Sequence, residues 1–141
     1  MMKKALDHIG IAVRDIHESI QFYTEILGGT LVDHYRSEAQ GVESEVAIID
    51  VDGSRIELLM PTNNDTSPIA RFMKQKGKGV HHIAYRVDDL DEALQELKQQ
   101  GIRTLEDTRR INKHGCRLIY LNPADTEGTI VEYCDYPDHI N

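Results

Sequence analysis

Two histidines and two glutamates could bind a metal ion, and they recur at equivalent positions of a repeated sequence. A shift of 74 residues carries His8 onto His82, and a shift of 75 carries Glu57 onto Glu132. The phrases DHIGIAV and HHIAYRV surround the histidines, and GSRIELL and GTIVEYC surround the glutamates. Self-similarity of this kind is the sequence signature of a duplicated structural unit. Each copy of the unit therefore contributes one imidazole and one carboxylate.

Imidazole and carboxylate together suit zinc, nickel, cobalt, manganese or ferrous iron, and four protein ligands leave one or two positions for water or substrate. A single histidine in a strand more often packs than binds metal, and a single glutamate more often faces solvent. Here both glutamates interrupt apolar runs, where a carboxylate is costly unless it is paired, protonated or bound to a cation. The coincidence of all four under one repeat favours a metal site. His81 has the opposite strand parity to His82, and we expect it to pack or to support a ligand.

The residues around each histidine predict a strand followed by a helix. HIGIAV and HIAYRV alternate as a strand does, with aliphatic residues on one face and the histidine on the other. Asp15 and Asp89 then stand where a helix N-cap is needed, and apolar residues follow both at helical spacing. The first helix is expected to end at Gly28 and Gly29, and the second at Gly101.

Strand-like runs complete each half of the chain. GTLVDHY, SEVAIIDV and SRIELLM follow the first helix, and IRTLED, CRLIYLN and GTIVEYC follow the second. The linker PTNNDTSPIARFMKQKGKG separates the halves and carries a predicted short helix over Ser67 to Gln75. We therefore predict an α+β protein of one domain, built from two tandem β-α-β-β-β modules: residues 1–65 with the start of the linker, and residues 66–141 with the linker helix.

The composition of the chain limits the classes of partner that it can bind. The formal net charge is −8 and the isoelectric point is about 5.3, which argues against a nucleic-acid surface, because binding many phosphates needs a basic stripe. No apolar run approaches the roughly 20 residues of a membrane span, and no targeting segment is apparent, so we expect a cytoplasmic protein. Cys116 and Cys134 lie in apolar runs and are expected to be small core residues.

The chain resembles the vicinal oxygen chelate superfamily, which includes glyoxalases, bleomycin-resistance proteins and dioxygenases, and within it the methylmalonyl-CoA epimerases. The phrases that carry the resemblance are DHIGIAV, QGV, IELLMP, SPIARFMKQKGKGVHHIAYRV and HGCRLIYLNPADTEGTIVEY. The resemblance implies a curved mixed sheet around a metal site, one divalent ion (Co²⁺, Zn²⁺, Ni²⁺ or Mn²⁺) and the ligands His8, Glu57, His82 and Glu132. In some epimerases the second ligand is Gln, so Glu57 departs from that variant and equally suits a bacterial glyoxalase I.

The implied reaction interconverts (R)- and (S)-methylmalonyl-CoA by removing a proton from the carbon between a thioester and a carboxylate. The cation stabilises the enolate, and two bases work on opposite faces of that carbon. The resemblance nominates Glu132 as one base. The other is expected in the strand after QGV, where Glu43 and Glu45 have the same parity, and we favour Glu45 because it lies nearer the apolar body of the strand.

The expected partner is a small acyl-CoA thioester. Cations near the site would hold the CoA group, and the available clusters are Lys74, Lys76, Lys78, Arg109, Arg110 and Lys113. We expect a homodimer, because half-modules with open sheet edges favour pairing. The alternatives are a glyoxalase I-type lactoylglutathione lyase, an extradiol-type dioxygenase and a metal-free drug-binding protein of the same fold.

Overall fold

A computed structural model of the chain describes residues 4–37, 43–62 and 67–137. The first half holds β1 (Lys4–Ala12), α1 (Ile16–Gln21), the π-helical turn η1 (Phe22–Ile26), β2 (Thr30–Ser37), β3 (Ser44–Val51) and β4 (Ser54–Pro61). The second holds α2 (Pro68–Lys76), β5 (Gly79–Val87), α3 (Leu90–Gln99), β6 (Thr104–Ile111), β7 (Arg117–Leu121), the 3₁₀ turn η2 (Pro123–Asp125) and β8 (Val131–Asp135). The predicted α+β class and the repeated β-α-β-β-β order are confirmed.

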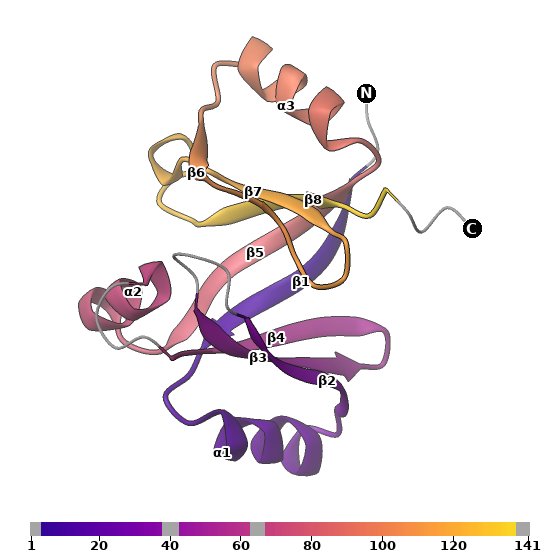
Figure 1. Ribbon diagram of the computed structural model, residues 1–141, viewed down its shortest axis with the longest axis vertical. Coiled ribbons are helices and arrows are strands. Elements are labelled where there is room, and N and C mark those ends of the chain that lie inside the picture. The colour runs from indigo at the N-terminus through magenta and orange to yellow at the C-terminus, as the bar shows by residue number, and fades with distance from the viewer. Residues whose placement is uncertain (1–3, 38–42, 63–66, 138–141) are drawn as a thin grey trace. The chain divides into compact units, whose positions relative to one another are not determined.

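The strands pair in the same way in both halves (Figure 1). In the first half the order is β2-β3-β4-β1, with β1 parallel to β4 and the other pairs antiparallel. In the second half the order is β6-β7-β8-β5, with β5 parallel to β8 and the other pairs antiparallel. Gly10 lies opposite Glu57 in one half, and Ala84 lies opposite Glu132 in the other. The sequence repeat is thus a repeat of strand register.

The chain divides into two compact units that cut across the sequence halves. Residues 8–81 form one unit, and the described residues of 1–7 and 82–141 form the other. We call them the first unit and the second unit. The first unit includes α2, whereas the sequence assigned this linker helix to the second module. The limits of the compact units therefore differ from the module limits at residues 65 and 66, which stay a prediction.

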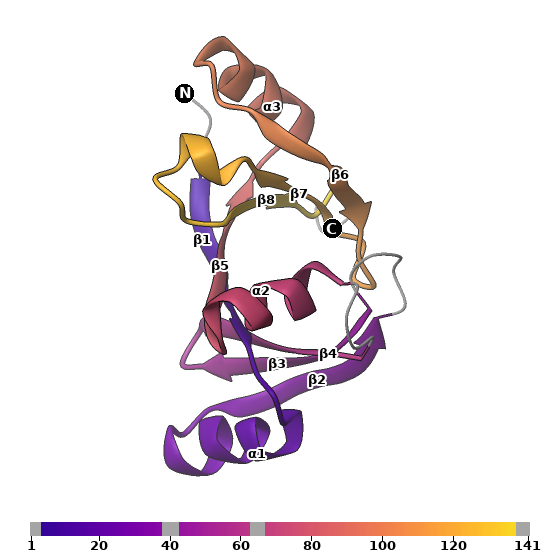
Figure 2. The same ribbon diagram turned by 90° about the vertical axis from the view of Figure 1, so that its left-hand side faces the viewer.

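The sheet of the first unit is covered by a helix on each face (Figure 2). On one face, Ile16 of α1 packs against Ala47, Ile49 and Leu58. On the other, Ile69 of α2 packs against Ala12, Val46, Ile48 and Leu59. Strand β3 is therefore apolar on both sides, a pattern typical of strands buried between two layers.

In the second unit, one face of the sheet packs on α3 through a cluster of Leu90, Ala93, Ile119, Leu121 and Tyr133, with Val87. The opposite face holds Cys116, Leu118, Tyr120 and Cys134. Both cysteines are buried, as predicted. The pKa of the Cys134 thiol is raised, first by its hydrogen bond with Cys116 and then by burial, which keeps it protonated and unreactive.

The helix ends follow their predicted signals. Asp15 and Asp89 are both N-caps, and each accepts a hydrogen bond from the backbone N–H three residues on. Gly28 and Gly101 follow the two helices with φ of +79° and +78°, a conformation that L side chains resist. Ser67 caps α2, which begins one residue later than predicted. Among the described residues, no helix is long and apolar enough to cross a membrane.

Candidate metal and substrate site

His8 and Glu57 form a pair in the first unit. Because Gly10 lies beside Glu57 in the parallel β1–β4 ladder, His8 stands two residues along on the same face. Its Nε2 lies 3.5 Å from Glu57 Oε2, with the side chains 5% and 18% exposed. Both residues belong to a group of histidine and acidic side chains whose ligand atoms are close enough to hold a metal ion.

His82 and Glu132 form the corresponding pair in the second unit. Ala84 lies beside Glu132 in the parallel β5–β8 ladder, so His82 again stands two residues along on the same face. Its Nε2 lies 3.4 Å from Glu132 Oε1, and the two side chains are only 3% and 5% exposed. The duplicated register therefore produces a duplicated contact.

The residues of each pair fit a divalent cation. Zinc and similar ions lie about 2.1 Å from histidine nitrogen and carboxylate oxygen, so two such atoms on one ion are separated by about 3.0–3.4 Å, depending on geometry. The observed 3.4 Å of the second pair lies at the upper end of this range, and the 3.5 Å of the first pair lies just above it. A small residue stands beside each carboxylate, Gly10 beside Glu57 and Ala84 beside Glu132, and leaves space on the same face of the sheet. Each pair can thus act as a two-ligand half of a metal site.

Glu45, the expected second base, does not face the His8–Glu57 pair. It lies opposite Met60, which belongs to the α1 cluster, whereas Glu57 points to the other face of β4. Its Oε2 lies 2.8 Å from Nε2 of His34, whose ring in turn contacts His17 of α1 at 5.7 Å between centroids. Glu43 shares the parity of Glu45. The expectation that Glu45 is a base at this pair is therefore corrected, because the strand register places it on the opposite face.

His81 packs in the first unit. Its ring meets that of Phe72 in α2 edge-on, with centroids 4.8 Å apart, and the residue is 5% exposed. The predicted packing role is confirmed.

Tyr120 and Arg110 lie near the second pair; the sequence offered Arg110 only as one of six candidate cations and did not single out Tyr120. Tyr120 lies opposite Glu132 in the β7–β8 ladder, and its ring centroid is 5.5 Å from that of His82. The Arg110 Cζ lies 5.7 Å from the centroid of the Tyr120 ring, on the side of the sheet away from α3. Alternation along CRLIYL could have placed Tyr120 with the pair, but no sequence signal marks a tyrosine in a strand as functional.

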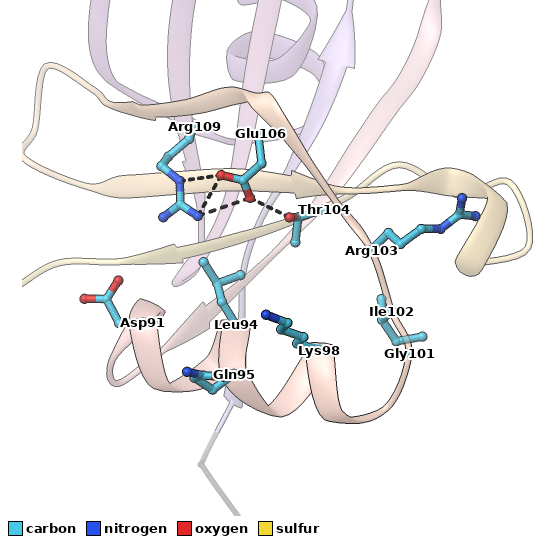
Figure 3. A pocket seen from close by; sticks show the side chains of 10 residues that line it. All are labelled: Asp91, Leu94, Gln95, Lys98, Gly101, Ile102, Arg103, Thr104, Glu106 and Arg109. Atoms are coloured by element: carbon cyan, nitrogen blue, oxygen red, sulfur yellow. Dashed lines mark hydrogen bonds and ion pairs between the residues drawn. The ribbon is translucent and has the colours of Figure 1, made fainter.

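The other arginine of this strand is placed differently. Arg109 lines an open groove of about 630 Å³ between α3 and β6 (Figure 3). There it is hydrogen-bonded to Glu106, whose other partner is Thr104. These contacts hold the pKa of Glu106 below its ordinary value, with the Thr104 hydrogen bond the larger cause. Arg109 therefore faces α3, and among the two only Arg110 faces the side of His82.

The remaining candidate cations lie at the ends of elements. Lys74 and Lys76 stand in the last turn of α2, where positive charge complements the helix dipole. Lys78 follows that helix, and Lys113 lies in the connection from β6 to β7.

Comparison with known proteins identifies the family of the chain. The sequence profile of the glyoxalase, bleomycin resistance protein and dioxygenase superfamily matches residues 7–120. The chain belongs to this superfamily. Both the fold and the resemblance deduced from the motifs are thereby confirmed.

Several relatives of the chain are named as epimerases. The chain is 38% identical to human mitochondrial methylmalonyl-CoA epimerase, over 90% of this chain and 71% of the human protein. It is 36% identical to the ethylmalonyl-CoA/methylmalonyl-CoA epimerase of Cereibacter sphaeroides, over 90% of this chain and 94% of that protein. A solved methylmalonyl-CoA epimerase in complex with methylmalonyl-CoA and NH₄⁺ is 32% identical, with a TM-score of 0.81 and coverage of 94% of both chains.

Proposed function

We propose that this protein is a metal-dependent epimerase that interconverts (R)- and (S)-methylmalonyl-CoA. The observation that carries the proposal is the duplicated His–Glu contact, found in a chain similar over nearly its whole length to methylmalonyl-CoA epimerases. That similarity supports an epimerase over the other activities of the superfamily. The solved relative bound to methylmalonyl-CoA supports an acyl-CoA substrate.

His8, Glu57, His82 and Glu132 would hold one divalent ion, with Co²⁺, Zn²⁺, Ni²⁺ and Mn²⁺ all compatible with two imidazoles and two carboxylates. Equivalent positions under the repeat, the matched spacing within each pair and the family support this set. When bound, the ion supplies Lewis-acid stabilisation of the negative charge that develops on the thioester oxygen.

Glu132 would remove the proton from the carbon between thioester and carboxylate. Its side chain is the more buried of the two carboxylates, 5% exposed against 18% for Glu57. The adjacent imidazole of His82 would hold this carboxylate in place. Returning the proton to the other face of the carbon requires a second group, and the placement of Glu45 takes it out of that role.

Solvent deuterium exchange into methylmalonyl-CoA tests the reaction, using protein reconstituted with each of the four metals. Exchange at the carbon between the two carbonyl groups, together with conversion of one epimer into the other, is the expected result. No exchange, together with turnover of a methylglyoxal–glutathione hemithioacetal, would replace the epimerase by a glyoxalase I-type lyase.

Elemental analysis tests the metal site separately from the reaction. His8→Ala and His82→Ala proteins are expected to lose most of the bound metal, with His81→Ala as a matched control that keeps it. Undiminished metal in both ligand variants would reject the proposed site.

The expected homodimer is also part of the proposal. Strand β2 ends the strand order of the first half and exposes Leu31 and Val32. Such an edge favours pairing with another chain. Sedimentation equilibrium of the full chain would show twice the monomer mass, and a mass of 16.0 kDa would contradict it.

A further inference from the structure

We propose that Arg110 binds an anionic oxygen group of the substrate beside the His82–Glu132 pair. The inference rests on the proposed function and assigns to that site the residue that recognises the charge of its substrate. Within the second unit, Arg110 lies over the Tyr120 ring, and Tyr120 contacts His82 and lies opposite Glu132. One side chain, Tyr120, therefore separates the guanidinium from His82, and Tyr120 is the ladder neighbour of Glu132.

The charge environment of Arg110 differs from that of the neighbouring arginines. Arg103, Arg109 and Arg117 each form an ion pair with a carboxylate, and so does Arg86. Among the residues that the structure describes, Arg110 has no carboxylate within ion-pair distance, although the chain carries a formal charge of −8. In an acidic protein, a half-buried arginine without a carboxylate retains an unused positive charge on the face that carries the proposed metal ligands.

Arg110 is also held in a fixed position. Its NH1 group donates a hydrogen bond of 3.0 Å to the backbone carbonyl of Thr108, and the Thr108 hydroxyl accepts one of 2.9 Å from the backbone N–H of Tyr120. One of the five guanidinium N–H donors is thus used for positioning, and the others remain for a ligand. A guanidinium that lies over an aromatic ring and is fixed at one corner is suited to two parallel hydrogen bonds with carboxylate or phosphate.

Methylmalonyl-CoA carries both kinds of anion. Its carboxylate is attached to the carbon that would lose the proton, and its phosphates lie on the CoA group. Both present oxygens that a guanidinium binds in the same planar geometry. If Arg110 holds the carboxylate, it orients the reacting carbon relative to Glu132. If it holds a phosphate, it anchors the CoA group at this side of the pair.

Arg109 provides a matched control. It is the adjacent residue and has the same chemistry, but it faces α3 and is paired with Glu106. Replacing either arginine removes the same charge from the same strand. A difference between the two variants therefore reports the position of the guanidinium and not the net charge of the protein.

The experiment compares Arg110→Gln, Arg110→Lys and Arg109→Gln in the metal-loaded protein. For Arg110→Gln we expect kcat/KM for methylmalonyl-CoA to fall about 10- to 100-fold, the loss typical of a charge-assisted hydrogen bond. Arg110→Lys should recover part of it, and Arg109→Gln should stay within about twofold of the unaltered protein. Titration with 2,2-dimethylmalonyl-CoA, which has no proton to lose, measures the binding affinity of each variant without turnover. The denaturation midpoint of each variant shows that the fold is kept.

A thioester of N-acetylcysteamine, which lacks the phosphates, distinguishes the two sources of the anion. If the loss in Arg110→Gln persists with methylmalonyl-N-acetylcysteamine, Arg110 binds the carboxylate; if it disappears, Arg110 binds a phosphate. Equal binding of 2,2-dimethylmalonyl-CoA by Arg110→Gln and the unaltered protein would overturn the inference, as would an equal loss in Arg109→Gln. Arg110-dependent binding without deuterium exchange would instead overturn the epimerase reaction and leave the anion site standing.

Discussion

The two units present the same pair of side chains in different surroundings. Glu57 lies opposite Ile48 and is 18% exposed, whereas Glu132 lies opposite Tyr120 and is 5% exposed. Arg110 lies over the Tyr120 ring, whereas Ile48 is an aliphatic residue of the cluster that packs on α2. Duplication has preserved the atoms suited to hold an ion, while the residues around them have diverged. The difference predicts that the two carboxylates, although equivalent in register, are not equivalent in function.

The largest expected effect comes from exchanging each carboxylate for its amide. Glu132→Gln should lower the rate of deuterium exchange about 10²- to 10⁴-fold, the usual contribution of a positioned acid–base group, because an amide cannot accept the proton. Glu57→Gln should lower the same rate far less, because the amide oxygen still offers a ligand atom to the metal ion. The rates are measured with protein loaded to the same metal content.

Metal analysis of the same two proteins serves as the control. Both variants should retain metal to a similar extent, so that the difference in rate reflects proton transfer. Equal losses of activity in the two variants would show that both glutamates act only as ligands, and the asymmetry between the units would have no catalytic meaning.

The next largest effect concerns the ion pair that the second unit has and the first lacks. In the β7–β8 ladder Arg117 lies opposite Asp135, where the β3–β4 ladder has Glu45 opposite Met60. Asp135 is buried, holds the guanidinium of Arg117 and accepts a hydrogen bond of 2.7 Å from the N–H of Leu90 at the start of α3. These contacts raise the pKa of Arg117 above its ordinary value, mainly through the Asp135 hydrogen bond.

Asp135→Ala should lower the free energy of unfolding by about 3 kcal/mol, the low end for removing one partner of a buried pair, because Arg117 is partly exposed. Asp91→Ala removes the exposed partner of the same arginine and should cost less than about 1 kcal/mol. Urea denaturation of both variants measures the difference. Similar values for the two would show that burial of Asp135 contributes nothing to the stability of the unit.

The sequence predicted the features that repeat, and it missed the faces of side chains in strands that lack a clear alternation. The strands, the aspartate caps and the two His–Glu pairs all follow from alternation and self-similarity. The face of Glu45 did not, because Val46, Ala47, Ile48 and Ile49 are all buried and the strand shows no alternation from which a face could be assigned. Arg110 was one of six candidate cations, since the irregular pairing of β6 between Leu105 and Arg110 interrupts the period of two that would have indicated its side.

The ends of the helices that follow the two histidine strands offer a smaller comparison. Gly29 follows α1 and η1 in close contact, and a Cβ there would lie 2.5 Å from Cγ2 of Ile49 and 2.9 Å from the carbonyl oxygen of Tyr23. Gly101 follows α3 in open space, where only its φ of +78° resists a side chain. Gly29→Ala should lower the free energy of unfolding by about 1–3 kcal/mol through overpacking. Gly101→Ala should lower it by about 1 kcal/mol through backbone strain. Denaturation midpoints check the order, and a larger loss at Gly101 would contradict it.

The smallest expected effect lies in the connections that precede the two glutamate strands. Asp52 and Gly53 make a tight turn before β4, with φ of +52° and +91°. The longer connection before β8 is tied to the start of β6 by Asp125, which accepts hydrogen bonds from the backbone N–H and the side chain of Arg103. The Arg103 hydrogen bonds lower the pKa of Asp125.

A carboxyl whose pKa is lower in the folded protein adds stability above its unfolded pKa, and that stability is lost as the pH falls through the folded value. Asp125→Asn should therefore melt slightly below the unaltered protein at neutral pH, and the gap should close in acid. The change is small because the pair is exposed. Melting temperatures of both proteins across the acid range provide the measurement, and a gap that widens on acidification would show that Asp125 does not stabilise this connection through its charge.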